Sequence, residues 1–274
     1  MSGQGPAYST DAEKVMKFFD CNCSFGLPAK PGPSPATCAT LEELQAQLDR
    51  AGIERALVWH LAQLDVSPQR GNELLAAATA GKDKEKLVGC WTMLPEQTGE
   101  MPVKKLLAAM KAHNVQALRA FPAAHRFLLN RETMGPLLDA MTERRLPLLY
   151  SIRRLPEWYS PHLAWNELFE LMSDFPNLTL VVTDHGSWGC DRYFRPLLEK
   201  YQRVYIDTAL YFLDGGLEDV AKRHGADRVL FGSGLPDRYA GGMMLAIRHA
   251  ELPEADRAAI AGGNLERLLK EVDL

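Results

Sequence analysis

Short apolar runs alternate with longer amphipathic stretches along almost the whole chain. The apolar runs recur roughly every 30 residues, a spacing that fits one strand, one helix and their connections. There are eight such runs, and each has the length and composition of a buried strand. This pattern predicts an α/β protein that folds as a (β/α)8 TIM barrel. The runs are residues 18–26, 55–59, 87–93, 115–120, 146–151, 178–183, 204–207 and 228–232.

A doubly wound open sheet is the alternative architecture for such a pattern. It is disfavoured because no G-x-G-x-x-G follows the first strand. The 274 residues suit one barrel, and no linker divides them. We therefore expect a single domain over residues 16–274, after a polar, disordered lead-in over residues 1–15. Thr40 and Glu43 predict the start of the first helix, as N-cap and capping-box residue.

The charge balance excludes some classes of partner. The chain has 31 basic and 35 acidic side chains, and its net charge is −4. Such mild acidity gives no electrostatic basis for binding nucleic acid or an anionic membrane. No apolar run reaches the roughly 20 residues that span a bilayer. The five cysteines form no C-x-x-C pair, which fits a reducing compartment. We expect a cytoplasmic protein, and the sequence leaves a homodimer open.

The first predicted strand carries polar residues at every second position. Asp20, Asn22 and Ser24 alternate with apolar residues and with Cys21 and Cys23. A period of two places the polar set on one face of the strand and the cysteines on the other. Because buried polar groups need partners or a function, we expect the polar face at a site and the cysteines against helices.

The carboxyl ends of the strands form the active face of a TIM barrel. Here these ends carry several arginines and histidines, which favour a small anionic ligand because guanidinium groups bind carboxylates in a bidentate manner. We predict Arg119 and Arg153 as the anion anchors. Further substrate contacts are expected from His60, Asn22, Ser24 and Ser151. The other strand-end residues are Trp91, Arg154, Asp184, His185, Asp207, Gly234, Asp237 and Arg238.

Five segments carry a family signature by their order and spacing. They are the Phe-Asp-x4-Phe-Gly of residues 19–26, the Asp-His-Gly of residues 184–186, and residues 204–207, 228–236 and 260–269. With these segments the chain resembles the amidohydrolase-related TIM-barrel hydrolases, the branch that contains aminocarboxymuconate-semialdehyde decarboxylase and pyrone-dicarboxylate lactonase. The resemblance implies the metal-dependent-hydrolase barrel over nearly the whole chain.

The resemblance also implies a metal site, which this chain does not match. The family carries D-x-H-x-H on the first strand, His on the fifth and sixth, and Asp on the eighth. The corresponding residues here are Asn22, Ser24, Ser151, His185 and Gly234. Only His185 keeps the family's ligand. Zinc needs three or more good N, O or S donors, so we predict a degenerate site without catalytic zinc or another divalent metal.

The leading hypothesis is a metal-independent hydrolase that acts on a small anionic lactone or related ester. His185 is predicted to be the general acid or base, oriented by Asp184 or Asp207. The resemblance supports this activity, because some lactonases of the group work without a metal. Asp237 is predicted to replace the missing strand-eight aspartate if its loop folds back.

Two alternatives stay open at this point. One is a catalytically inactive barrel that binds an anionic small molecule or a partner, since a fold does not fix a function. The other is a metal-dependent hydrolase or decarboxylase with displaced ligands. Its ligands would come from His60, His125, Asp184, Cys21 or Cys23.

Overall fold

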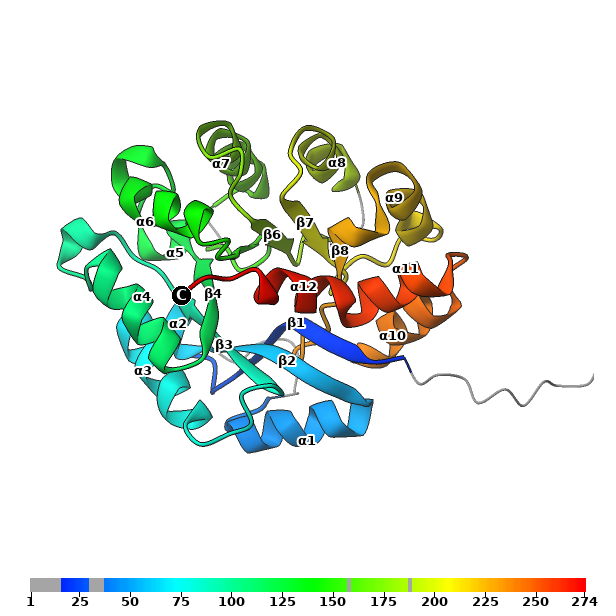
Figure 1. The fold of residues 1–274 in the computed structure, drawn as a ribbon, viewed down its shortest axis with the longest axis horizontal. Coiled ribbons are helices and arrows are strands. Elements are labelled where there is room, and N and C mark those ends of the chain that lie inside the picture. The colour runs from blue at the N-terminus through cyan, green and yellow to red at the C-terminus, as the bar shows by residue number, and fades with distance from the viewer. Residues whose placement is uncertain (1–15, 30–36, 157–158, 187–188) are drawn as a thin grey trace, which may run out of the picture.

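Eight parallel strands follow one another around the sheet in the order of the sequence. The structure is a computed structural model that describes residues 16–29, 37–156, 159–186 and 189–274; the predicted lead-in lies outside these ranges. Helices surround the strands, as Figure 1 shows. The strands are β1 (Phe18–Phe25), β2 (Ile53–His60), β3 (Leu87–Thr92), β4 (Val115–Ala120), β5 (Leu148–Ser151), β6 (Leu180–Thr183), β7 (Val204–Asp207) and β8 (Val229–Leu230). This arrangement confirms the predicted (β/α)8 barrel.

Backbone hydrogen bonds join the first strand to the segment that follows the last one. Cys21 N–H donates to the Phe231 carbonyl at 2.9 Å. Farther along, the Gly234 N–H donates to the Asn22 carbonyl at 2.9 Å, and Ser24 N–H donates to the Leu235 carbonyl at 2.9 Å. The ladder continues past the two residues of β8, and in this way the sheet closes on itself.

The helices agree with most of the predicted amphipathic stretches. Thr40 caps α1 by accepting the Glu43 N–H at 3.3 Å, whereas the Glu43 carboxylate accepts the Ala39 N–H. The sequence did not indicate α5, which Pro122 begins, or α10, which contains Gly241 and Gly242. The main helices are α1 (Leu41–Ala51), α3 (Pro68–Thr79), α4 (Val103–Ala112), α6 (Arg131–Glu143), α7 (Pro161–Asp174), α8 (Asp191–Lys200), α9 (Gly216–His224) and α10 (Ala240–His249). The shorter elements are α2 (Ala62–Asp65), η1 (Glu96–Thr98), α5 (Pro122–His125), η2 (Ala226–Arg228), α11 (Glu254–Ala258), η3 (Ala259–Gly263) and α12 (Asn264–Lys270).

Two apolar clusters divide the core. The larger one fills the space between the strands and the outer helices. The smaller one takes alternate residues from every strand and includes Leu265, Leu268 and Leu269 of α12. Helix α12 lies across the centre of the ring in Figure 1, so its leucines cover that end of the barrel. In the described part of the chain, each helix is too short or too polar to cross a membrane.

A β-bulge in β1 changes the predicted alternation. Asp20 pairs with Ala56 and Cys23 pairs with Val58, so three steps on β1 face two on β2. One extra residue in a strand reverses the inward and outward sides beyond it. Cys21 therefore belongs to the inner cluster and Cys23 to the outer one. The prediction that both cysteines point outward was wrong for Cys21.

The buried carboxylate of Asp20 ties the bulge to the end of β8. It accepts the backbone N–H groups of Asn22 at 2.9 Å and Ser233 at 3.0 Å, and also the Ser233 hydroxyl. Asp20 is fully buried. A side chain that satisfies three buried donors at the seam of the barrel should be important for stability.

We expect the substitution Asp20→Ala to lower the free energy of unfolding by about 3 kcal/mol, because it leaves buried donors without an acceptor. Urea unfolding followed by circular dichroism measures this change. Asp49→Ala on the exposed side of α1 is the matched control and should change stability by less than about 0.5 kcal/mol. Equal stability of the two variants would contradict a structural role for the Asp20 carboxylate.

Candidate functional site

The side-chain amide of Asn22 bonds to three polar side chains from separate parts of the barrel. Its Nδ2 donates to Asp184 Oδ1 at 3.0 Å and to Asp207 Oδ2 at 2.9 Å. Its Oδ1 accepts a hydrogen bond from Arg119 Nη2 at 3.1 Å. We call Asn22, Arg119, Ser151, Asp184 and Asp207 the strand-end network. These residues come from β1, β4, β5, β7 and the residue after β6, so the barrel gathers them at its carboxyl end.

Asp184 is the member of the network that is partly exposed to solvent. Ser151 Oγ donates to its Oδ2 at 2.7 Å, and its backbone N–H donates to Asp207 Oδ1 at 3.0 Å. Its φ of 54° lies in the left-handed region, which is rare for residues other than glycine. Such a conformation persists where surrounding bonds enforce it, and it is frequent at functional sites. The network thus fixes one accessible carboxylate in a defined orientation.

Asp207 accepts the Asp184 N–H and is fully buried. Burial raises the pKa of its carboxyl well above the usual value, and the negative charge of Asp184 raises it further. The hydrogen bonds from Asn22 and from the Asp184 N–H, together with the charge of Arg119, oppose this rise in pKa. Two adjacent carboxylates in a buried site favour retention of one proton by the pair. We expect the pair to hold that proton mainly at Asp207.

Arg119 is fully buried and only partly satisfied. Its Nη2 bonds to Asn22, but its Nε and Nη1 have no hydrogen-bond partner among the described residues. Its guanidinium carbon lies 4.9 Å from the centre of the Trp59 ring. Burial raises the pKa of the nearby Cys90 thiol to about 11, although the positive charge of Arg119 opposes this rise. Because a thiol is a weak acceptor, the guanidinium still has capacity for an anion or water.

His185 is buried and lies between aromatic rings. Its ring centre is 4.9 Å from that of Phe194 and 5.3 Å from that of Tyr211. Nδ1 lies 2.9 Å from the Gly186 carbonyl, and Nε2 lies 2.9 Å from the Asp207 carbonyl. The ring therefore contacts backbone carbonyls, and not the carboxylate of Asp184 or Asp207 that we expected to orient it. Burial lowers the pKa of His185, so the neutral ring can donate to only one of the two carbonyls.

Two predicted substrate contacts, Ser24 and His60, do not take part in the bonds of the network. Ser24 is buried. His60 is half-buried, its Nδ1 accepts the Ala62 N–H at 3.0 Å, and burial lowers its pKa. A side chain at Gly26, whose φ is 103°, would approach the His60 ring to 2.7 Å. Glycine at this position therefore allows the loop after β1 to pass close over His60.

The loop after β8 does not place Asp237 in the network. Asp237 is exposed and its Oδ2 accepts a hydrogen bond from Arg154 Nη2 at 2.5 Å. Gly234, which we expected at the position of the family's aspartate, has a φ of 70°. Arg153, predicted as an anion anchor, is exposed, whereas its neighbour Arg154 is half-buried and lies 5.0 Å from the Trp59 ring. Trp59 was not predicted as a site residue, although its two-residue spacing from the inward-facing Leu57 was a usable signal.

The donors around the network are poorly suited to a metal ion. Within the described ranges, no three His, Cys, Asp or Glu side chains gather in a way that could hold a metal ion. The amide N–H groups of Asn22 donate to one oxygen of Asp184 and to one oxygen of Asp207. The ring nitrogens of His185 face carbonyls. A divalent cation would have to displace these donors before it could bind there.

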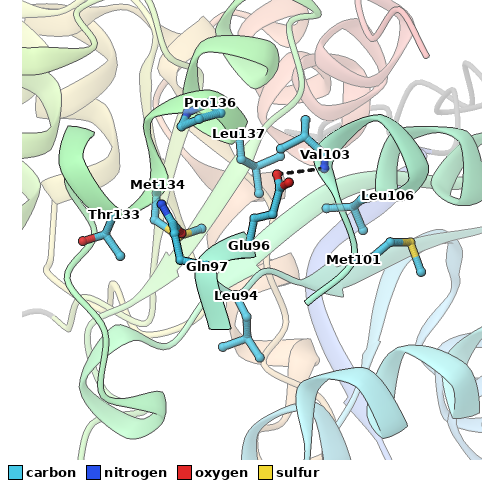
Figure 2. Close-up of a pocket in the computed structure, with 10 residues that line it drawn as sticks. All are labelled: Leu94, Glu96, Gln97, Met101, Val103, Leu106, Thr133, Met134, Pro136 and Leu137. Atoms are coloured by element: carbon cyan, nitrogen blue, oxygen red, sulfur yellow. Dashed lines mark hydrogen bonds between the residues drawn. The ribbon is translucent and has the colours of Figure 1, made fainter. Parts of the chain in front are cut away.

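A pocket of about 370 Å³ lies outside the strand-end network. It is formed by η1 and the first turns of α4 and α6 (Figure 2). Its lining is mainly apolar, and the Glu96 carboxylate within it accepts the Val103 N–H at 3.3 Å. The pocket shares no residue with the network.

The fold and the position of the network define a (β/α)8 barrel with a polar site at the carboxyl ends of its strands. Within this class, a model of the amidohydrolase family matches residues 26–270, and the chain belongs to that family. This match confirms the resemblance seen in the sequence. A comparison with curated protein sequences found no match.

Several solved structures share this fold. One is 2,6-dihydroxybenzoate decarboxylase from Rhizobium, with 16% identity, a TM-score of 0.73, and coverage of 93% of this chain and 99% of that chain. Another is 5-carboxyvanillate decarboxylase from Novosphingobium aromaticivorans complexed with manganese, with 15% identity, a TM-score of 0.72, and coverage of 94% and 97%. A third is an uncharacterized TIM-barrel protein from Bordetella bronchiseptica, with 18% identity, a TM-score of 0.69, and coverage of 93% and 99%. At these identities the similarity shows the fold alone.

The raised pKa of Asp207 predicts a pH dependence of stability. As the pH rises above the ordinary value of 3.8, the unfolded chain loses this proton first and the folded chain keeps it. Stability should therefore fall as the pH rises, until the folded group also ionises. Asp207→Asn should flatten this fall when urea unfolding is measured from about pH 4 to 8. Asp214→Asn, on the exposed loop after β7, should keep the wild-type slope, and an unchanged slope in Asp207→Asn would contradict the assignment.

Proposed function

We propose that the protein is a hydrolase of a small anionic substrate, such as a lactone or related ester, and that it works without a catalytic metal. The strand-end network supports this proposal. In it, the partly exposed and rigidly held carboxylate of Asp184 lies near the buried guanidinium of Arg119, which has free N–H groups. Such an arrangement can supply both a general base and an anion contact.

Asp184 takes the role of the general base in this proposal. Its carboxylate accepts a proton from a water molecule while the water oxygen forms a bond to the acyl carbon of the substrate. The bond between the acyl carbon and the ester oxygen then breaks, and the leaving oxygen takes up a proton from the carboxyl group. Arg119 stabilises negative charge on the substrate through its unpartnered N–H groups. His185 follows β6, and its Nε2 lies 2.9 Å from the Asp207 carbonyl at the end of β7, so its ring packs the ends of these strands together.

The protonation of Asp207 sets the negative charge next to Asp184. A proton held at Asp207 removes a negative charge from beside the Asp184 carboxylate. Ser151 and Asn22 donate to the two oxygens of Asp184 and keep it oriented. This division of roles between two carboxyl groups depends on their different exposure to solvent.

A second candidate is the decarboxylation of an aromatic acid. The similar structures described above include two decarboxylases of aromatic acids, one of them complexed with manganese. Both candidate reactions need an anion contact, so Arg119 has the same role in each. They differ in the product, which is a ring-opened or cleaved acid in one case and carbon dioxide in the other.

We expect turnover of at least one member of a panel of carboxylated lactones and aryl esters, measured by acid release. Asp184→Asn should lower kcat by 100-fold or more, in line with the roughly 10²–10⁴-fold contribution of a general base. Asp214→Asn is the control for the loss of a negative charge at this face. Release of carbon dioxide from a matched panel of hydroxybenzoates, without hydrolysis, would favour the second candidate. Anion binding without turnover of either panel would show a binding protein instead.

Metal dependence is tested separately. Turnover should be unchanged after dialysis against a chelator, and elemental analysis should find less than about 0.1 zinc or manganese per chain, since a site with fewer than three good donors binds these ions weakly. Stoichiometric metal, with activity lost on chelation and restored by added zinc or manganese, would overturn the metal-free part of the proposal.

A further inference from the structure

Two guanidinium groups lie on the ring of Trp59. Those of Arg119 and Arg154 are 4.9 and 5.0 Å from the ring centre, within the range of cation–π contacts. Trp59 is only 1% exposed, so its ring is a fixed support for both cations. The two arginines therefore lie close to the same ring, although Arg119 is on β4 and Arg154 is in the loop after β5.

Arg154 reaches this neighbourhood from the loop that follows β5. Two strands, β3 and β4, separate β5 from β2, which carries Trp59. The guanidinium also bonds to Asp237 from the loop after β8, on the other side of β5 in the strand order. The Arg154 N–H donates to Ser151 Oγ at 3.2 Å, which joins the backbone of this residue to the strand-end network. The Arg154 side chain thus contacts Trp59 of β2 and Asp237 of the loop after β8.

The Arg154–Asp237 ion pair differs from the environment of Arg119. Its side chains are 27% and 43% exposed, and ion pairs so accessible to water are weak. Arg119 is fully buried and is bonded to the neutral amide of Asn22. A second carboxylate could replace Asp237 at low cost, while the inner arginine keeps N–H groups free to bind the same molecule.

We propose that the Arg154–Asp237 ion pair is an internal competitor of the substrate: the carboxylate of Asp237 occupies Arg154 in the free protein, and a substrate carboxylate replaces it. This inference deepens the proposed function, because it specifies Arg154 as the group that selects the anionic substrate. It makes Asp237 an inhibitory contact and not a replacement for the aspartate missing at Gly234.

The test uses benzoate as the probe and isothermal titration calorimetry of the full-length protein. Asp237→Asn should lower the Kd for benzoate by about two- to fivefold, because it frees Arg154 from a weak ion pair. Asp214→Asn removes an equal charge from the exposed loop after β7 without touching Arg154, and it should leave the Kd within about 1.5-fold of wild type. An equal gain in both variants would show a general electrostatic effect and would overturn the inference.

A second pair of variants tests the arginine itself. Arg154→Gln should raise the Kd for benzoate by about fivefold or more, whereas Arg192→Gln, at an exposed position in the first turn of α8, should change it by less than about twofold. In the Arg154→Gln background, Asp237→Asn should give no further gain, since the competition needs both partners. Benzamide, which lacks the charge, should bind equally to all variants or to none.

Binding and turnover are measured separately, so the two proposals fail separately. Absence of benzoate binding in wild type and in Asp237→Asn, with both variants folded by circular dichroism, overturns the inference about the ion pair. A wild-type protein that binds benzoate and obeys the Asp237 cycle, yet turns over neither panel, overturns the proposed function and leaves the ion pair as a binding determinant.

Discussion

The bulge in β1 determines where the polar network can form. With strict alternation, Cys21 and Asn22 would lie on opposite sides of the sheet. The extra residue in the register lets Cys21 join the inner cluster while the Asn22 amide reaches β4, β6 and β7. Asp20 holds this irregular backbone by accepting the Asn22 N–H and by bonding to Ser233. Glycine at position 232 leaves space for the Asp207 carboxylate, since a Cβ there would lie 2.7 Å from Asp207 Oδ2.

Asparagine at position 22 suits the centre of this network better than the histidine that we expected there from the family's pattern. The Asn22 side chain donates to two carboxylates and accepts from one guanidinium. A neutral imidazole has one donor and one acceptor, so it could not satisfy all three groups at once. An imidazolium would add a second cation beside Arg119. Asn22 therefore provides the required donors without a charge or a proton equilibrium of its own.

The sequence allowed prediction of the barrel because its strands are apolar and its helices amphipathic. Strands β4 and β7 lie at the predicted residues. Strand β8 is shorter than predicted at both ends, because residues 226–228 form a turn of helix and residues 231–232 lie beyond the strand. The bulge could not be read from the sequence, since its extra residue, between Asp20 and Cys23, fits the same alternation of polar and apolar side chains. Arg119 and Asp184 were predicted as site residues from their places at strand ends. The reach of Arg154 was not predictable, because loop side chains are placed by long-range contacts such as those with Trp59 and Asp237.

Arg119 and Arg154, the two arginines at Trp59, differ in the groups that balance their positive charge. This difference determines which arginine an anion contacts first. Arg154 is accessible and is paired with a carboxylate that water can also solvate. Arg119 is fully buried and is bonded to the neutral amide of Asn22, and no carboxylate of the described residues forms an ion pair with it. An entering anion meets the outer arginine first, and the exchange there replaces one carboxylate by another with little change in charge. Arg119 is fully buried, where the dielectric is lower, so its contact with an anion is electrostatically stronger. A neutral molecule of the same shape gains neither contact, which is why charge, more than shape, should decide what this barrel binds.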